Sequence, residues 1–131
     1  MTLAAAMDRL IPPVDDVPGA GAMLEAALAM AARHDRFRTV PTAFAAALPA
    51  DFAGLPAAAQ DAALRAVEQT ALPLFREMLE LVTLAYYADP RVHARIGWRS
   101  GPLQPRGFPL PPFDEAVLAT ARRRAPFWRG V

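Results

Sequence analysis

The side chains that could carry acid–base or metal chemistry are few and scattered. Histidine occurs only at His34 and His93, and no second ligand follows either residue at a spacing of three or four. A metal site needs at least three converging donors. Glu77 and Glu80 are three residues apart and could share proton-transfer work if buried, but the apolar stripe of their segment lies elsewhere. We therefore expect a solvated face and no catalytic, metal-binding or cofactor-binding residue in this chain.

The remaining motifs exclude several other classes of function. Gly19-Ala20-Gly21 weakly resembles a nucleotide-binding loop, but it lacks a preceding strand and a third glycine, which favours a simple turn before a helix. The chain has no cysteine, so disulfides, thiolate nucleophiles and Fe–S ligation are excluded. Arg122–Arg124 and Arg129 form a small basic cluster, but the net charge is only +1, which argues against a nucleic-acid partner.

The distinctive feature is a gathering of aromatic residues in the last third of the chain. They are Tyr86, Tyr87, Trp98, Phe108, Phe113, Phe127 and Trp128. These rings could fill the protein's own core, or they could anchor an interface, since aromatic and arginine side chains are the usual interface anchors. Nearby prolines would lower the entropy lost on docking. Both uses can coexist.

The elements that must position these residues are predicted to be helices. The 131 residues suit one domain, and apolar residues recur at three- and four-residue spacing. The expected helices are Leu3–Leu10, Ala20–Arg33, Thr39–Leu48, Pro56–Leu84 and Glu115–Arg123. Within the longest, Pro73 lacks an amide donor, so we expect a kink or break near Gln69–Leu72, with two shorter helices as the alternative.

Beyond Tyr87 the pattern changes. From Asp89 to Pro112 proline and glycine are frequent and the periodicity vanishes, although large apolar residues such as Ile96 and Leu103 remain. This composition predicts an ordered, extended arm, followed by the short helix that Asp114 caps. The predicted fold is therefore all-α, with about five helices in a small irregular domain. Residues 1–88 would form a helical core, and 89–131 a Pro-rich, partner-docking arm.

Several of these segments resemble one known family. The stretches are Met7–Pro13, Pro18–Ala20, Leu81–Arg91, Gly97-Trp98, Gly101-Pro102, Pro105–Gly107 and Phe113-Asp114. In order and spacing they are similar to the gluconate 2-dehydrogenase subunit 3 family. Members of that family are the small, or gamma, subunits of FAD-dependent sugar and sugar-acid dehydrogenases, and the resemblance covers nearly the whole chain.

The resemblance implies a non-catalytic subunit that helps a large partner to fold, take up flavin or leave the cell. That partner would be a flavoprotein dehydrogenase of the glucose–methanol–choline type, which holds the FAD. A cytochrome c subunit would be a further partner. The residues expected to bind the large subunit are Tyr86, Tyr87, Asp89, Pro90, Arg91, Trp98, Arg106, Phe108, Phe113 and Trp128.

Many relatives in that family start with a twin-arginine leader, which this sequence lacks as written, so we expect a cytoplasmic protein. A periplasmic location would follow if a leader was removed or is supplied by the partner. No apolar run approaches the roughly 20 residues that a membrane-spanning helix needs. The alternative functions are a stand-alone helical ligand-binding domain and a protein that associates with copies of itself.

Overall fold

A computed structural model describes residues 2–99, 101, 107 and 112–124, in two compact units that span Met1–Arg99 and Ser100–Val131. The predicted all-α class is confirmed, because the described residues form seven α-helices and no β-strand. There are more than the expected five because the longest predicted helix is divided in two and a further helix follows it.

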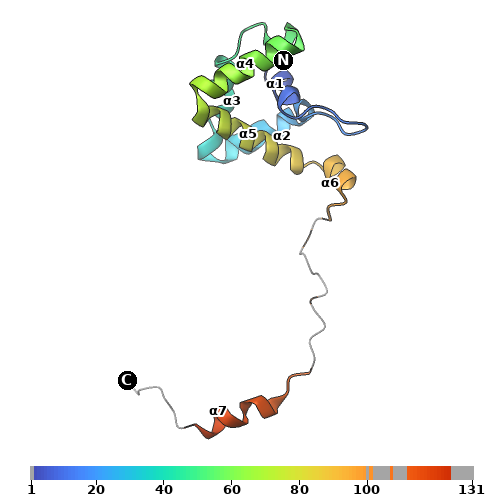
Figure 1. The fold of residues 1–131 in the computed structure, drawn as a ribbon, viewed down its shortest axis with the longest axis vertical. Helices are drawn as coiled ribbons and strands as arrows, with labels where there is room; N and C mark the ends of the chain where they lie inside the picture. The colour runs from blue at the N-terminus through green and yellow to red at the C-terminus, as the bar shows by residue number, and fades with distance from the viewer. Residues whose placement is uncertain (1, 100, 102–106, 108–111, 125–131) are drawn as a thin grey trace, which may run out of the picture. The chain divides into compact units, whose positions relative to one another are not determined.

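The first unit contains six of these helices, joined by short loops and 3₁₀ turns (Figure 1). They are α1 (Thr2–Leu10), α2 (Leu24–Arg33), α3 (Val40–Ala46), α4 (Ala57–Thr70), α5 (Leu72–Tyr87) and α6 (Pro90–Ile96). The 3₁₀ turns are Ala20–Met23, Asp35–Phe37 and Phe52–Gly54.

Helix α5 is the centre of the first unit and packs against α2, α3 and α4. Its inward side carries four buried residues at three- and four-residue spacing: Met78, Leu81, Val82 and Ala85. Phe44 of α3 is fully buried, and its ring lies 6.2 Å from that of Phe75. The core is therefore assembled around one helix, as the apolar stripe of the sequence indicates.

The break between α4 and α5 falls where proline predicts it. Ala71 leaves the helical region, with φ −140° and ψ 50°, and Pro73 occupies the first turn of α5. Proline is tolerated there because the first amides of a helix have no partner within the helix. The interruption is a complete break, so the alternative of two shorter helices is the one found.

A close approach of two chain segments fixes the N-terminal region. The carboxylate of Asp8 in α1 accepts a 2.7 Å hydrogen bond from the amide of Gly21. A side chain at Gly21 would meet the carbonyl oxygen of Ala4 at 2.5 Å, and one at Gly19 would collide with Asp8 itself. The two glycines therefore let the turn Ala20–Met23 lie directly against α1.

Two further polar contacts join α4 to its neighbours. Arg9 of α1 forms a half-buried ion pair with Asp61 at 2.6 Å. The side-chain amide of Gln60 donates to the carbonyl oxygen of Phe52 at 2.9 Å. Gln60 is the buried polar residue of the described chain, and its side chain is hydrogen-bonded, as a buried amide must be.

The segment after residue 88 differs from the expected extended arm. Residues 90–96 form α6, whose Val92 is buried among the core residues, and the first unit continues to Arg99. Asp89 caps the helix, Pro90 suits its first turn, and Gly97 ends it in the left-handed conformation with φ 69°. These local signals stabilise a helix even though the segment is rich in proline and glycine.

In the second unit, a 3₁₀ turn at Glu115–Leu118 leads into α7 (Ala119–Arg123). The expected cap is confirmed, because the carboxylate of Asp114 accepts a 2.9 Å hydrogen bond from the amide of Ala116. The predicted helix Glu115–Arg123 therefore forms with its first turn wound more tightly. Arg106, Phe108 and Trp128 lie outside the described residues.

The contact between Asp8 and Gly21 predicts an asymmetry between two glycine substitutions. Gly21→Ala should lower the free energy of unfolding by about 1–3 kcal/mol, because the new methyl group meets a backbone oxygen that cannot move aside. Gly54→Ala is the control, since nothing lies within 4 Å of its added methyl group. Urea denaturation of both variants measures the difference; equal stability would contradict the close approach.

Candidate functional site

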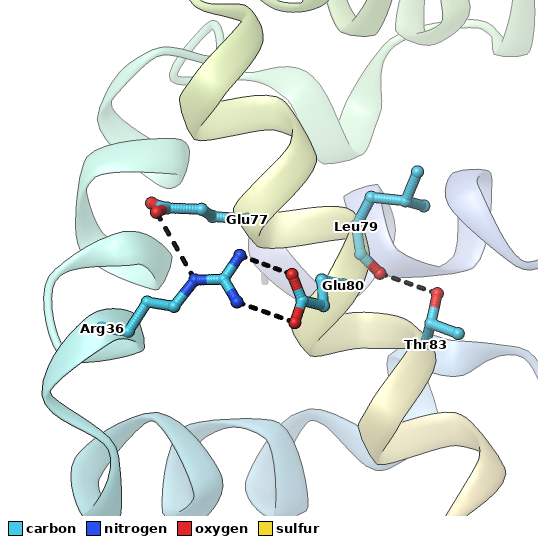
Figure 2. Close-up of polar contacts among 5 residues, drawn as sticks. All are labelled: Arg36, Glu77, Leu79, Glu80 and Thr83. Carbon is cyan, nitrogen blue, oxygen red and sulfur yellow. Dashed lines mark hydrogen bonds and ion pairs between the residues drawn. The ribbon is translucent and has the colours of Figure 1, made fainter.

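The two candidate acid–base residues, Glu77 and Glu80, form ion pairs on a solvated face. Arg36 donates to both carboxylate oxygens of Glu80, at 2.9 and 2.5 Å, and its Nε lies 3.8 Å from Glu77 (Figure 2). The guanidinium carbon also lies 5.0 Å from the centre of the Phe37 ring. This geometry joins the turn Asp35–Phe37 to α5.

Metal-holding groups and membrane-spanning helices are both missing from the described residues. No group of three or more histidine, aspartate or glutamate side chains in that part of the chain is arranged to hold a metal ion. Nor does any described helix combine the length and apolar character needed to cross a membrane. The most distinctive site is instead the junction of α5 and α6.

Asp89 organises the start of α6. Its carboxylate accepts a 2.8 Å hydrogen bond from the backbone amide of Arg91. It also accepts two hydrogen bonds from the Arg91 side chain, one from Nε at 2.9 Å and one from a terminal nitrogen at 2.8 Å. These hydrogen bonds, with the Arg91 side chain as the largest cause, lower the pKa of Asp89 to about 2 from an ordinary 3.8. The charges of Asp89 and Arg91 are therefore paired with each other, which indicates that the two residues serve to position α6.

The end of α6 places Trp98. Gly97 donates to the carbonyl of Ala94 at 3.3 Å, and the Trp98 amide donates to the carbonyl of His93 at 2.9 Å. This pair of hydrogen bonds around a left-handed glycine is a Schellman motif. The Trp98 ring lies 6.3 Å from the His93 ring, at the two positions whose side chains often contact each other in this motif.

His93 connects this motif to the end of α5. Its Nε2 is hydrogen-bonded to the carbonyl oxygen of Tyr87. Because a carbonyl oxygen can only accept, His93 is the donor, and Nε2 carries a proton. The rings of Tyr86 and Tyr87 meet edge to face at 5.4 Å. Tyr86 packs partly against the core, while Tyr87 lies largely in solvent.

These residues surround a shallow hollow of about 240 Å³, which is lined by Tyr87, His93, Ile96 and Trp98. The lining is almost entirely apolar. Tyr87, Ile96 and Trp98 are 52%, 55% and 56% exposed. An apolar cavity of about 150 Å³ can hold a benzene ring, so the hollow has room for one large apolar side chain.

Three leucines of α5, Leu72, Leu79 and Leu84, are exposed as well. Leu79 lies on the same side of the helix as Thr83 and Tyr87, at spacings of four and eight, whereas Leu84 follows the exposed Glu80 by one turn. The hydroxyl of Thr83 donates to the carbonyl of Leu79 at 2.7 Å, so it is satisfied within the helix (Figure 2). We call this surface the α5–α6 face; its residues are Leu72, Leu79, Leu84, Tyr87, Ile96 and Trp98.

The structure brings together six of the residues predicted to bind a partner: Tyr86, Tyr87, Asp89, Pro90, Arg91 and Trp98. Only Tyr87 and Trp98 of these present large apolar groups outward, since Asp89 and Arg91 are paired and Pro90 begins a helix. Phe113 is exposed and belongs to the second unit.

Sequence reasoning did not single out His93 and Ile96 as lining residues, nor Leu79 and Leu84 as surface residues. A signal for the first pair was present, because Asp89-Pro90 and Gly97 are start and stop signals of a helix that spans both. The exposure of the leucines depends on how few helices surround α5, which no local pattern encodes.

No family model, curated protein or solved structure matches this chain. The likeness to the gluconate 2-dehydrogenase subunit 3 family therefore rests on the sequence segments alone.

The low pKa of Asp89 predicts a pH dependence confined to α6. The stabilisation from the carboxylate is fully present above the unfolded pKa near 4 and is lost as the pH falls through about 2. Over that range the amides of Arg91 and Val92 should lose protection against hydrogen exchange, relative to amides in the middle of α5. Asp89→Asn cannot titrate and should remove this dependence; the same acid response in both proteins would exclude Asp89 as its source.

Proposed function

We propose that this protein is a non-catalytic accessory subunit that binds and stabilises a large FAD-dependent dehydrogenase of the glucose–methanol–choline type, which acts on a sugar, glycoside or sugar acid. The single observation that carries the proposal is the α5–α6 face. Its six large apolar residues are exposed on a unit that already has a well-packed core.

Such a face favours a protein partner for energetic reasons. Large apolar side chains that are exposed close to one another on a monomeric protein mark interaction surfaces. Tryptophan and tyrosine dominate the binding energy of interfaces, especially where they surround a pocket. Here the hollow between Tyr87 and Trp98 would receive an apolar side chain of the partner, and the leucines of α5 would extend the contact.

The position of the anchors favours strong binding. Trp98 is held by two backbone hydrogen bonds around Gly97 and by the adjacent ring of His93. A side chain that is already in place loses little conformational entropy when a partner covers it. The face is thus suited to bind without rearrangement of α6.

The mechanism of stabilisation would be mass action. A subunit that binds only the folded form of its partner shifts the partner's folding equilibrium, and the shift grows with concentration above the dissociation constant. At a hundredfold excess over that constant the effect is about 2.7 kcal/mol. No catalytic group is needed for this role.

Flavoprotein dehydrogenases are proposed as the partner class because of the motif resemblance. Within the first unit, the resembling segments fall in two places with different roles. Met7–Pro13 and Pro18–Ala20 build the internal contact around Asp8. Leu81–Arg91 and Gly97-Trp98 build the α5–α6 junction, which carries Leu84, Tyr87 and Trp98 of the α5–α6 face. A partner that requires the second group of residues at its interface would account for their pattern.

Co-expression tests the proposal. The full chain should co-purify with the large flavoprotein subunit from the same host and should raise its soluble yield and FAD content. A large subunit that is equally soluble, flavin-loaded and active when expressed alone would refute the proposal. Light scattering on the purified chain tests the alternative of self-association, because association of two copies through the face would give a concentration-dependent dimer.

Trp98 provides a quantitative prediction for the complex. Trp98→Ala should weaken binding of the large subunit by about 2 kcal/mol, or about thirtyfold in Kd, because it removes one wall of the hollow. Leu28→Ala is the matched control: Leu28 is an exposed apolar residue on α2, outside the face. Calorimetric titration measures both. A Kd for Trp98→Ala within about twofold of the control value would rule out the hollow as the anchor.

A further inference from the structure

The described part of the second unit, residues 112–124, is a short helical segment with no buried side chain. Asp114 caps it, the turn Glu115–Leu118 begins it, and α7 continues it to Arg123. Phe113 and Val117 are each 69% exposed, and Leu118 is exposed as well. Nothing within these residues covers the apolar groups.

The segment has a short apolar stripe and a polar side. Val117 and Ala121 are four residues apart in the helical turns, which is the spacing of one helix face, and the exposed Phe113 precedes the cap at Asp114. Glu115 and Arg122 are seven residues apart and are joined by a 3.4 Å hydrogen bond, which marks a polar side. The pattern is typical of a helix that lays one face into an apolar groove.

Such a short helix is marginal in water by itself. Isolated helices shorter than about 12–15 residues gain too few hydrogen bonds to offset the cost of nucleation. The cap at Asp114 and the hydrogen bond from the Arg123 Nε to the carbonyl of Ala119, at 3.1 Å, stabilise its two ends. Burial of the apolar stripe against another surface would supply further stabilisation.

The charges of the segment indicate what that surface carries. Three arginines, Arg122, Arg123 and Arg124, close the segment, and in residues 112–124 only Arg122 has an acidic partner. The acidic residues Asp114 and Glu115 lie at the opposite end, where the carboxylate of Asp114 binds the helix amides. A complementary groove would therefore be apolar along its floor and acidic at the end that receives the arginines.

We infer that residues 113–124 fold against an apolar groove with an acidic end on the large flavoprotein subunit, as a second anchor in addition to the α5–α6 face. This inference rests on the proposed function and specifies how the partner is held. Residues 100–112 link the segment to the first unit and can span at most about 45 Å. Once the α5–α6 face is bound to the partner, docking of the segment is therefore an intramolecular step. Two linked contacts of this kind bind more tightly than either alone.

An anionic membrane is the competing surface for a helix that ends in arginine. A membrane-bound helix usually distributes its basic residues along the whole polar face. Here the polar side begins with Glu115, and the basic residues are confined to one end. That arrangement favours a protein groove with localised carboxylates.

Hydrogen exchange of the full chain, alone and in the purified complex with the large flavoprotein subunit, tests the inference. We expect the amides of residues 115–123 to exchange rapidly in the free chain and to become protected in the complex. Protection in the free chain would overturn the inference, because the segment would then be covered by its own protein. A complex in which these amides stay unprotected would also overturn it, while leaving the proposed function intact. Failure to form any complex would overturn both.

Three variants test the apolar face and the charge. Val117→Asp should weaken the complex by about tenfold or more, whereas Ala119→Asp adds the same charge off the apolar stripe and should change Kd by less than about threefold. Arg124→Glu should lower the association rate and its dependence on salt. Equal effects of the two aspartates would refute an apolar docking face. Binding of the full chain to phosphatidylserine vesicles that Val117→Asp abolishes would assign the segment to a membrane and overturn the groove.

Discussion

One constraint governs this protein: its central helix, α5, has more apolar surface than the surrounding helices can cover. Met78, Leu81, Val82 and Ala85 are enclosed by α2, α3 and α4. Leu79 and Leu84 of the same helix remain in solvent. A unit of this size cannot enclose a helix from every side, because small domains bury a limited fraction of their surface. The exposed side of α5 thus follows from the way the core is built, and it continues into the hollow of α6.

The local chemistry of α6 gives this apolar surface a defined shape. Asp89 fixes the start of the helix, Gly97 fixes its end, and His93 joins it to the last carbonyl of α5. Trp98 is thereby held beside Tyr87 across a hollow that has room for one large side chain. The side chains of Asp89, Arg91 and His93 form hydrogen bonds within this region, so the hollow is apolar while the scaffold beneath it is hydrogen-bonded.

Periodicity is sufficient to predict the helices before residue 88, and Pro73 is sufficient to predict the break between α4 and α5, because both effects are local. Helix α6 was predicted as an extended arm, since the overall frequency of proline and glycine outweighed the specific positions of Asp89, Pro90 and Gly97. The pairing of Arg36 with Glu80 and the contact of Asp8 with Gly21 join segments distant in sequence. Contacts of this kind depend on how the helices pack, and no spacing along the chain indicates them.

The central claim is that the α5–α6 face is covered in the working protein by a large flavoprotein subunit. Radical footprinting with mass spectrometry measures this directly, because side-chain oxidation follows solvent exposure. The account predicts that oxidation of Tyr87, Ile96 and Trp98 falls sharply in the complex, while that of Leu28 on α2 stays as it is in the free chain. Unchanged oxidation of Tyr87 and Trp98 in a complex that has formed would contradict the account.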